Sequence, residues 1–149
     1  MPNKTQIVIN QFAINNIVNV PCDSVFSNLL IQSCTIKRPY DSSEGIKKTN
    51  EYGEVVMIHT DSQRYTIGTD VSTRVENISQ RGKTGFGIEI QGGEVRATYR
   101  FFFCPEIDIQ NNDIALIGTR EYQVLLVSEF YDADSIHHKE VLLRNISNL

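Results

Sequence analysis

The sequence predicts an all-β protein, specifically a small antiparallel β-barrel of about six to eight strands. Ile, Val, Asn and Thr are prominent and Trp is absent, which favours strands and turns over long helices. Turn residues recur roughly every 8–12 residues between short runs of apolar or alternating side chains. The final third predicts a three-stranded meander with tight connections. Its strands are the runs Ile114–Ile117, Tyr122–Val127 and Ile136–Leu143.

Length and charge limit the class of protein. A chain of 149 residues suits a single domain with a real core. Its formal net charge of −4 and pI near 5.3 provide no surplus of positive charge to neutralise phosphates, so a general nucleic-acid binder is not expected. The start of the chain lacks the apolar run of a signal peptide, and no segment reaches the length of a membrane span. We therefore expect a soluble intracellular product.

The three cysteines, Cys22, Cys34 and Cys104, are odd in number and widely separated, with no Cys-x-x-Cys pair. This pattern predicts neither a disulfide framework nor a structural zinc site. We expect small buried or half-buried thiols in a reducing cytoplasm.

Residues 1–28 are interpreted as an N-terminal arm, and residues 29–149 as the barrel domain. Phe12, Ile14 and Ile17 are apolar but separated by Asn, which is a poor helix former, and Pro21 would end a helix. Asp23 or Ser24 is expected to cap one helical turn. The arm is too apolar for a disordered tail, so we expect it to pack on the domain or to reach a neighbour.

The expected strands before the meander differ in how their faces are patterned. The run Leu29–Lys37 has apolar residues on both faces, which favours an interior strand or a covered face. The run Glu94–Phe103 alternates most clearly, with one side in the core and one side in water. Its inward face carries Val95, Ala97, Tyr99, Phe101 and Phe103. Glu54–Thr60 and Arg64–Ile67 are also expected to be strands.

The segment Gly68–Gly93 is expected to project from the barrel as a loop or hairpin. Three glycines fall within six residues at Gly82, Gly85 and Gly87, beside Arg81 and Lys83. A phosphate cradle would need the Walker spacing and a following helix, whereas the residues that follow here are β-like. A mobile, locally basic loop is the preferred interpretation, and a loop that lines a pore or touches DNA in an oligomer is the alternative.

No constellation of catalytic residues emerges. Adjacent residues of a regular strand point to opposite faces, so His137 and His138 are not expected to chelate one ion together. His138 and Glu140 share a face, but two ligands are too few for a metal site. Phe101, Phe102 and Phe103 resemble a stacking platform for single-stranded nucleic acid, although alternation favours core packing. The chain is therefore expected not to be an enzyme and to use no cofactor or metal.

The C-terminal half resembles the head-completion or head–tail stopper proteins of long-tailed bacteriophages. The resemblance covers about residues 50–143 and rests on two runs, Asp113–Val124 and Ile136–Leu143. The family typically has an Asp before a strand of the type Leu-Gly-x-Arg-x-Tyr-x-Val. Its final strand carries a His-His or His-Tyr pair before an acidic residue and Val.

The resemblance implies a β-barrel that assembles into a ring of about six or twelve copies. Such a ring joins the portal and its adaptor ring to the tail terminator or tube, and a loop from each subunit enters the channel to retain packaged double-stranded DNA. It implies location at the head–tail interface of a virion assembled in the host cytoplasm, without a membrane partner. By position, the channel-facing loop comprises Gln80, Arg81, Gly82, Lys83, Thr84, Gly85, Phe86 and Gly87, and the docking residues are Phe12, Ile14 and Ile17.

Two alternatives remain open. The first is a tail-terminator or other tail-tube ring subunit, which also uses a β-barrel with long loops. The second is a small barrel that binds nucleic acid or an oligosaccharide through the aromatic strand and Arg96 and Arg100.

Overall fold

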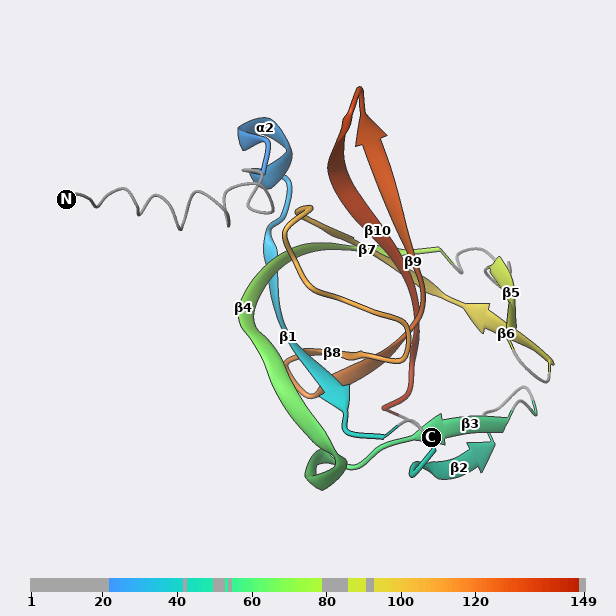
Figure 1. Cartoon of the computed structure of the whole chain (residues 1–149). Helices are drawn as coiled ribbons and strands as arrows, with labels where there is room; N and C mark the ends of the chain where they lie inside the picture. The colour runs from blue at the N-terminus through green and yellow to red at the C-terminus, as the bar shows by residue number, and fades with distance from the viewer. Residues whose placement is uncertain are drawn as a thin grey trace.

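The computed structural model describes residues 22–41, 43–49, 53, 55–78, 86–90 and 93–147, and for residues 86–90 and 93–95 it describes the backbone. Six strands form a closed antiparallel barrel with the order β1-β4-β7-β10-β9-β8, which confirms the predicted fold class (Figure 1). The barrel strands are β1 (Gln32–Pro39), β4 (Arg64–Asn77), β7 (Tyr99–Phe103), β8 (Ile114–Ile117), β9 (Arg120–Asp132) and β10 (Ser135–Asn145). The described helices are the single turns α2 (Ser24–Ser27) and η1 (Asp61–Gln63).

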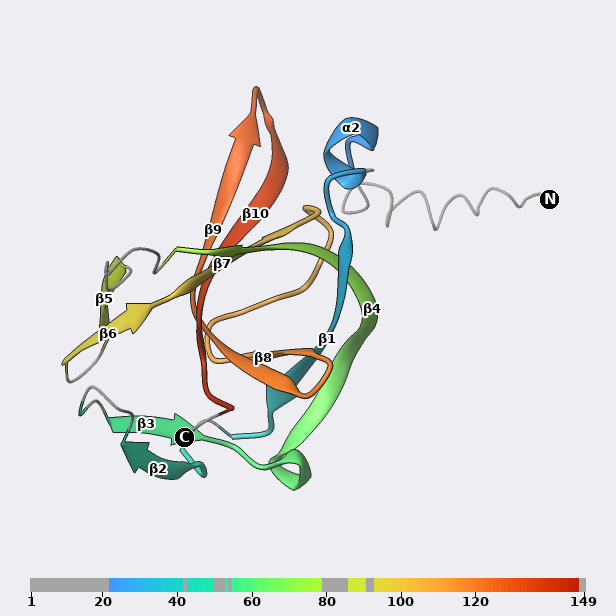
Figure 2. The ribbon, with the colours of Figure 1, turned by 180° about the vertical axis from the view of Figure 1, so that it is seen from behind.

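Two hairpins are inserted into the barrel sequence. The hairpin of β2 (Ile46–Thr49) and β3 (Val55–Ile58) lies between β1 and β4 in the chain, and that of β5 (Phe86–Ile90) and β6 (Gly93–Ala97) lies between β4 and β7. Figures 1 and 2 show both hairpins outside the barrel wall, while the end of the β9–β10 hairpin rises above the barrel beside α2. The closed wall is therefore made without β2, β3, β5 or β6.

The main core fills the barrel interior. Phe101 and Phe103 of β7 are completely buried, as alternation predicts, and Phe101 and Tyr122 meet edge to face with ring centroids 5.1 Å apart. The other buried members are Cys34, Ile36, Val71, Ile109, Ala115, Val124, Val141 and Leu143.

Two smaller apolar clusters attach the inserted hairpins to the outer wall. Val56 of β3 packs on Ile114 of β8 and on Ile146. Ala97, at the end of β6, packs with Leu125 of β9. Ile114 and Leu125 directly neighbour the interior residues Ala115 and Val124 along their strands, so they face outward.

Several predicted boundaries differ from the structure. β4 continues as a barrel strand to Asn77, so the projecting part begins after that residue and not at Gly68. β1 begins at Gln32, because Leu29 and Ile31 are exposed residues ahead of the strand. β2 was not predicted, since its four exposed residues show no apolar face. The predicted helical turn is α2, capped by Asp23.

Candidate interaction site

The residues predicted to face a channel or to dock a partner fall largely outside the described part of the chain. Residues 79–85 are not described, so Gln80 through Gly85 keep the status of predictions, as do Phe12, Ile14 and Ile17 of the N-terminal arm. Phe86 and Gly87 begin β5, where their backbone pairs with Ala97 and Arg96 of β6. Of the predicted loop, the structure thus describes the last two residues, which lie in strand β5.

The base of the β5–β6 hairpin is fixed to the barrel by main-chain hydrogen bonds. The Ile78 amide donates to the Thr98 carbonyl at 3.0 Å, and the Thr98 amide donates to the Leu143 carbonyl at 2.9 Å. Thr98 is the break between β6 and β7 in what the sequence predicted as one strand. Together with the Ala97–Leu125 contact, these bonds position the hairpin on the outer wall of β9 and β10.

The β9–β10 hairpin is the main feature that extends beyond the barrel (Figures 1 and 2). Its strands stay paired out to Asp132 and Ser135, and Ala133 makes the turn with a positive φ of 56°. Phe130 and Tyr131 near the tip are 42% and 62% exposed. Large apolar side chains on a projecting hairpin are suited to contact with another molecule.

A β-bulge in β10 brings His137 and His138 together. The pairing register with β9 shifts between Ile136 and His138, and the two Nδ1 atoms lie 2.9 Å apart. The expectation that these side chains point apart is therefore wrong, because a bulge re-aims the side chain of the inserted residue. One Nδ1 donates and the other accepts, so the two rings share one proton at this contact.

His138 is the centre of an aromatic cluster on the outer wall. Its Nε2 lies 3.2 Å from Glu140 Oε1, which confirms that the two residues share a face. The Phe130 ring stacks on His138 with centroids 5.1 Å apart and an interplanar angle of 6°, and the Phe26 ring of α2 lies at 5.0 Å. Phe102 completes the cluster from β7. Both His138 nitrogens have partners within β10, and its ring contacts with Phe26 and Phe130 join α2, β9 and β10.

The described residues do not form a metal-binding cluster. Among the residues that the structure describes, no group of three or more His, Cys, Asp or Glu side chains is placed to hold an ion. A metal bound by both Nδ1 atoms would also have to displace their mutual hydrogen bond.

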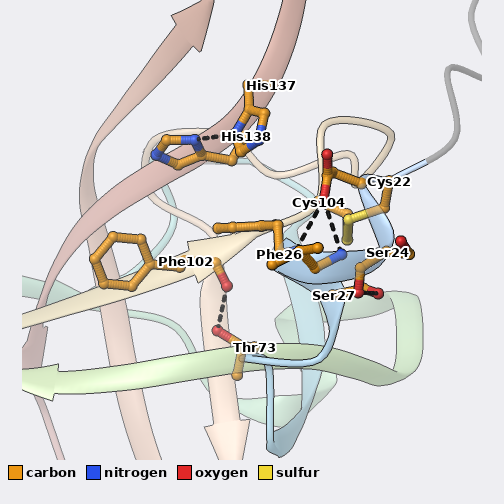
Figure 3. Close-up of a disulfide and its surroundings, with 11 residues drawn as sticks. Cys22, Ser24, Phe26, Ser27, Thr73, Phe102, Cys104, His137 and His138 are labelled. Carbon is orange, nitrogen blue, oxygen red and sulfur yellow. Dashed lines mark hydrogen bonds between the residues drawn. A yellow bond between two sulfur atoms is a disulfide. The ribbon is translucent and has the colours of Figure 1, made fainter. Parts of the chain in front are cut away.

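Cys22 and Cys104 form a disulfide, which corrects the prediction of reduced thiols (Figure 3). Their Cα atoms are 5.4 Å apart although they are separated by 82 positions in the sequence. The fold creates this proximity by placing the start of α2 against the end of β7, and cysteine spacing carries no information about such a contact. The prediction of a buried thiol is confirmed for Cys34, whose pKa burial raises to about 12.

Asp113, the first residue of the phage-like motif, is a structural anchor. Its carboxylate accepts hydrogen bonds from Arg38 Nε at 2.8 Å and Arg38 Nη2 at 2.9 Å, and a third from the Gln110 amide at 2.8 Å. Hydrogen bonding to Asp113 and then to Asp108 raises the pKa of Arg38 above its ordinary value. The pair joins β1 to the turn before β8 at the seam where the barrel closes.

A polar layer lies near the β2–β3 hairpin. The buried Arg64 places Nη2 3.0 Å from Glu121 Oε1. Gln123 accepts from Arg144 at 2.9 Å and donates to the Met57 carbonyl at 3.3 Å. These side chains connect β3, β4, β9 and β10, and residue spacing gave no signal for any of these contacts.

An open depression of about 400 Å³ lies at one mouth of the barrel. The β8–β9 turn forms one side, and Gln32, Val75 and Tyr122 form the rest. Gly118 gives this turn its positive φ of 61°. The lining side chains are apolar or neutral apart from Arg120.

Two of the three phenylalanines considered for base stacking, Phe101 and Phe103, are completely buried, whereas Phe102 is half-buried on the outer wall. Phe101 is completely buried, and Tyr99 packs against the core with its ring centroid 5.0 Å from that of Tyr122. Core packing, which alternation favoured, is therefore confirmed for both residues.

Comparisons with known proteins give one structural likeness. No protein-family model and no curated protein matches the chain. Among solved structures, it is similar to the phage-like element PBSX protein xkdH from Bacillus subtilis, with a TM-score of 0.41 and 18% identity over 79% of this chain and 96% of that one. A likeness at this level does not transfer a function. Within the described residues, neither helix has the length and apolar character required to cross a bilayer.

Proposed function

We propose that this chain is a structural protein of a long-tailed phage virion, namely a subunit of the head–tail connector ring that retains packaged DNA. The observation that carries the proposal is that the residues of the phage-like motif hold the barrel together. Asp113 anchors the closing seam, Gly118 makes the β8–β9 turn, and Tyr122 and Val124 lie in the core.

The position of the inserted hairpin supports the proposed role of residues 80–87. The β5–β6 hairpin, which begins at Phe86, stands on the outer wall, and the six-stranded barrel closes without it. In a ring, Arg81 and Lys83 of every copy would be repeated around the channel, and weak phosphate contacts would add up.

The proposal is tested by locating the protein in virions. We expect electron cryo-microscopy with gold-labelled antibody to place the chain in a ring between the portal adaptor and the tail. Label along the tail or at its terminator would favour the tail-ring alternative, and absence from purified virions would exclude both.

A variant separates DNA retention from assembly. With Arg81→Gln and Lys83→Gln together, we expect the neck to assemble normally but filled heads to lose DNA, because lumenal positive charge is removed. The matched control is Lys47→Gln with Lys48→Gln on the exposed strand β2, for which assembly and retention should stay unchanged. Normal retention by the Arg81/Lys83 variant would contradict the assigned role of the loop.

A further inference from the structure

We propose that the Cys22–Cys104 disulfide is a redox-controlled latch that holds residues 22–31 against the outer wall of the barrel. Formation of the latch joins the start of α2 to the end of β7, and reduction releases the segment while the barrel stays closed. The inference is independent of the virion function proposed above.

The described segment is held to the barrel by few contacts besides this bond. In the part of the chain that the structure describes, the hydrogen bonds of residues 23–30 join these residues to one another, as from the Ser27 amide to the Asp23 carbonyl. α2 has no buried residue, and Val25 is 73% exposed. A segment with few tertiary contacts opens locally at low cost.

Two noncovalent contacts accompany the disulfide. The Phe26 ring lies beside both histidines, with centroids 5.3 Å from His137 and 5.0 Å from His138, and Figure 3 shows Phe26 near both the histidines and the disulfide. Leu30, just before β1, is 7% exposed. The Phe26 and Leu30 contacts position residues 22–31 on the barrel, and the disulfide bonds Cys22 covalently to Cys104.

The redox step is a thiol–disulfide exchange with a low-molecular-weight dithiol as the reductant. The Cys22–Cys104 bond breaks, two electrons and two protons pass to the protein, and two thiols form while the dithiol becomes a cyclic disulfide. Cys34 does not take part, because its thiol is buried and burial raises its pKa to about 12, leaving little thiolate to attack.

Amide exchange of the whole chain before and after treatment with dithiothreitol tests the latch. We expect one titratable thiol in the oxidised denatured protein and three after reduction. On reduction, the amides of Ser27, Asn28, Leu29 and Leu30 should exchange at least about tenfold faster, and the resonances of His138 should shift as Phe26 leaves. The paired amides of β7 and β10 should remain protected for hours.

Matched variants complete the test. Cys22→Ser should show the fast exchange without any reductant, and Cys34→Ser should behave like the parent protein in both states. Three thiols in protein purified and kept under air would overturn the latch. Unchanged exchange in residues 27–30 after reduction would also overturn it, as would loss of protection throughout the barrel, which would make the bond a general support of the fold.

Discussion

Asp113 joins the two edges of the sheet that meet to close the barrel. Its carboxylate is 1% exposed and carries a two-pronged ion pair with Arg38 of β1, whereas Asp108 contributes to the same guanidinium from a 66% exposed position. A buried charge that loses its partner has no water to replace it, so the two aspartates should differ greatly in their importance.

We expect Asp113→Asn to lower the free energy of unfolding by roughly 3 kcal/mol, because Arg38 is left without its main counter-charge. Asp108→Asn should cost less than about 1 kcal/mol. Urea denaturation followed by circular dichroism measures both values. Equal losses for the two variants would contradict the anchoring role of Asp113.

The cap that the Asp23 carboxylate forms on α2 depends on the charge of that carboxylate, and therefore on pH. The amides of Phe26 and Val25 donate to its carboxylate and hold its pKa below the usual value of 3.8. A depressed folded-state pKa stabilises the cap above the unfolded pKa, and the stabilisation is lost as the pH falls through the folded pKa.

We therefore expect the amide protons of Val25 and Phe26 to titrate in nuclear magnetic resonance spectra with a midpoint below 3.8. Asp23→Asn, which caps a helix without a charge, should abolish this titration and keep α2. A midpoint at or above 3.8 would show that the carboxylate does not accept these bonds in solution.

At the level of secondary-structure elements, the end of the β9–β10 hairpin is stabilised by side chains on its outer face. The bulge at His137 places the His138 ring against Phe130 of the partner strand and against Phe26 of α2. Among the described strands, β7 pairs with β10 only from Lys139 onward, so the tip of the hairpin has no third strand and these ring contacts stabilise it.

Phe130→Ala should lower the free energy of unfolding by about 1 kcal/mol, the usual size of an aromatic pair interaction. It should also shift the ring protons of His138 as the stacked ring is removed. Tyr131→Ala, at a 62% exposed position, should change stability by less than about 0.5 kcal/mol and leave His138 unchanged. Thermal unfolding and proton spectra check both; identical His138 shifts in the two variants would exclude the stacking.

At the scale of the whole molecule, barrel closure is independent of the β5–β6 hairpin. Asn77 of β4 already pairs with Tyr99 of β7, and the Ile78 amide bonds to the Thr98 carbonyl. Strands β4 and β7 are therefore already paired like the two strands of a hairpin at the point where the β5–β6 insertion begins and ends.

Replacement of residues 79–97 by an Asn-Gly turn should thus give a folded, cooperative barrel. We expect a loss of about 2 kcal/mol, because Leu125 loses the cover of Ala97. Far-ultraviolet circular dichroism and thermal unfolding measure the result. A chain that fails to fold, while Ala97→Gly in the full-length protein folds normally, would show that the hairpin is needed for closure.

The sequence determined the features that depend on neighbouring residues. The meander was predicted from the apolar run Ile114–Ile117 and from the turn residues Gly118 and Asp132–Ser135. In the structure, β8 begins and ends at Ile114 and Ile117, as that run does. The inward face of β7 followed from alternation at Phe101 and Phe103. Asp23 as a helix cap followed from local side-chain chemistry.

Contacts between residues that are distant in the sequence depend on how the whole chain folds. The Cys22–Cys104 bond, the Arg38–Asp113 pair and the contact between Gln123 and the β3 backbone all join segments that are far apart in sequence. The bulge that joins His137 and His138 arises from the register of β10 on β9. Strand pairing and register are set by burial of the whole barrel, which is a property of the closed sheet and not of any one strand.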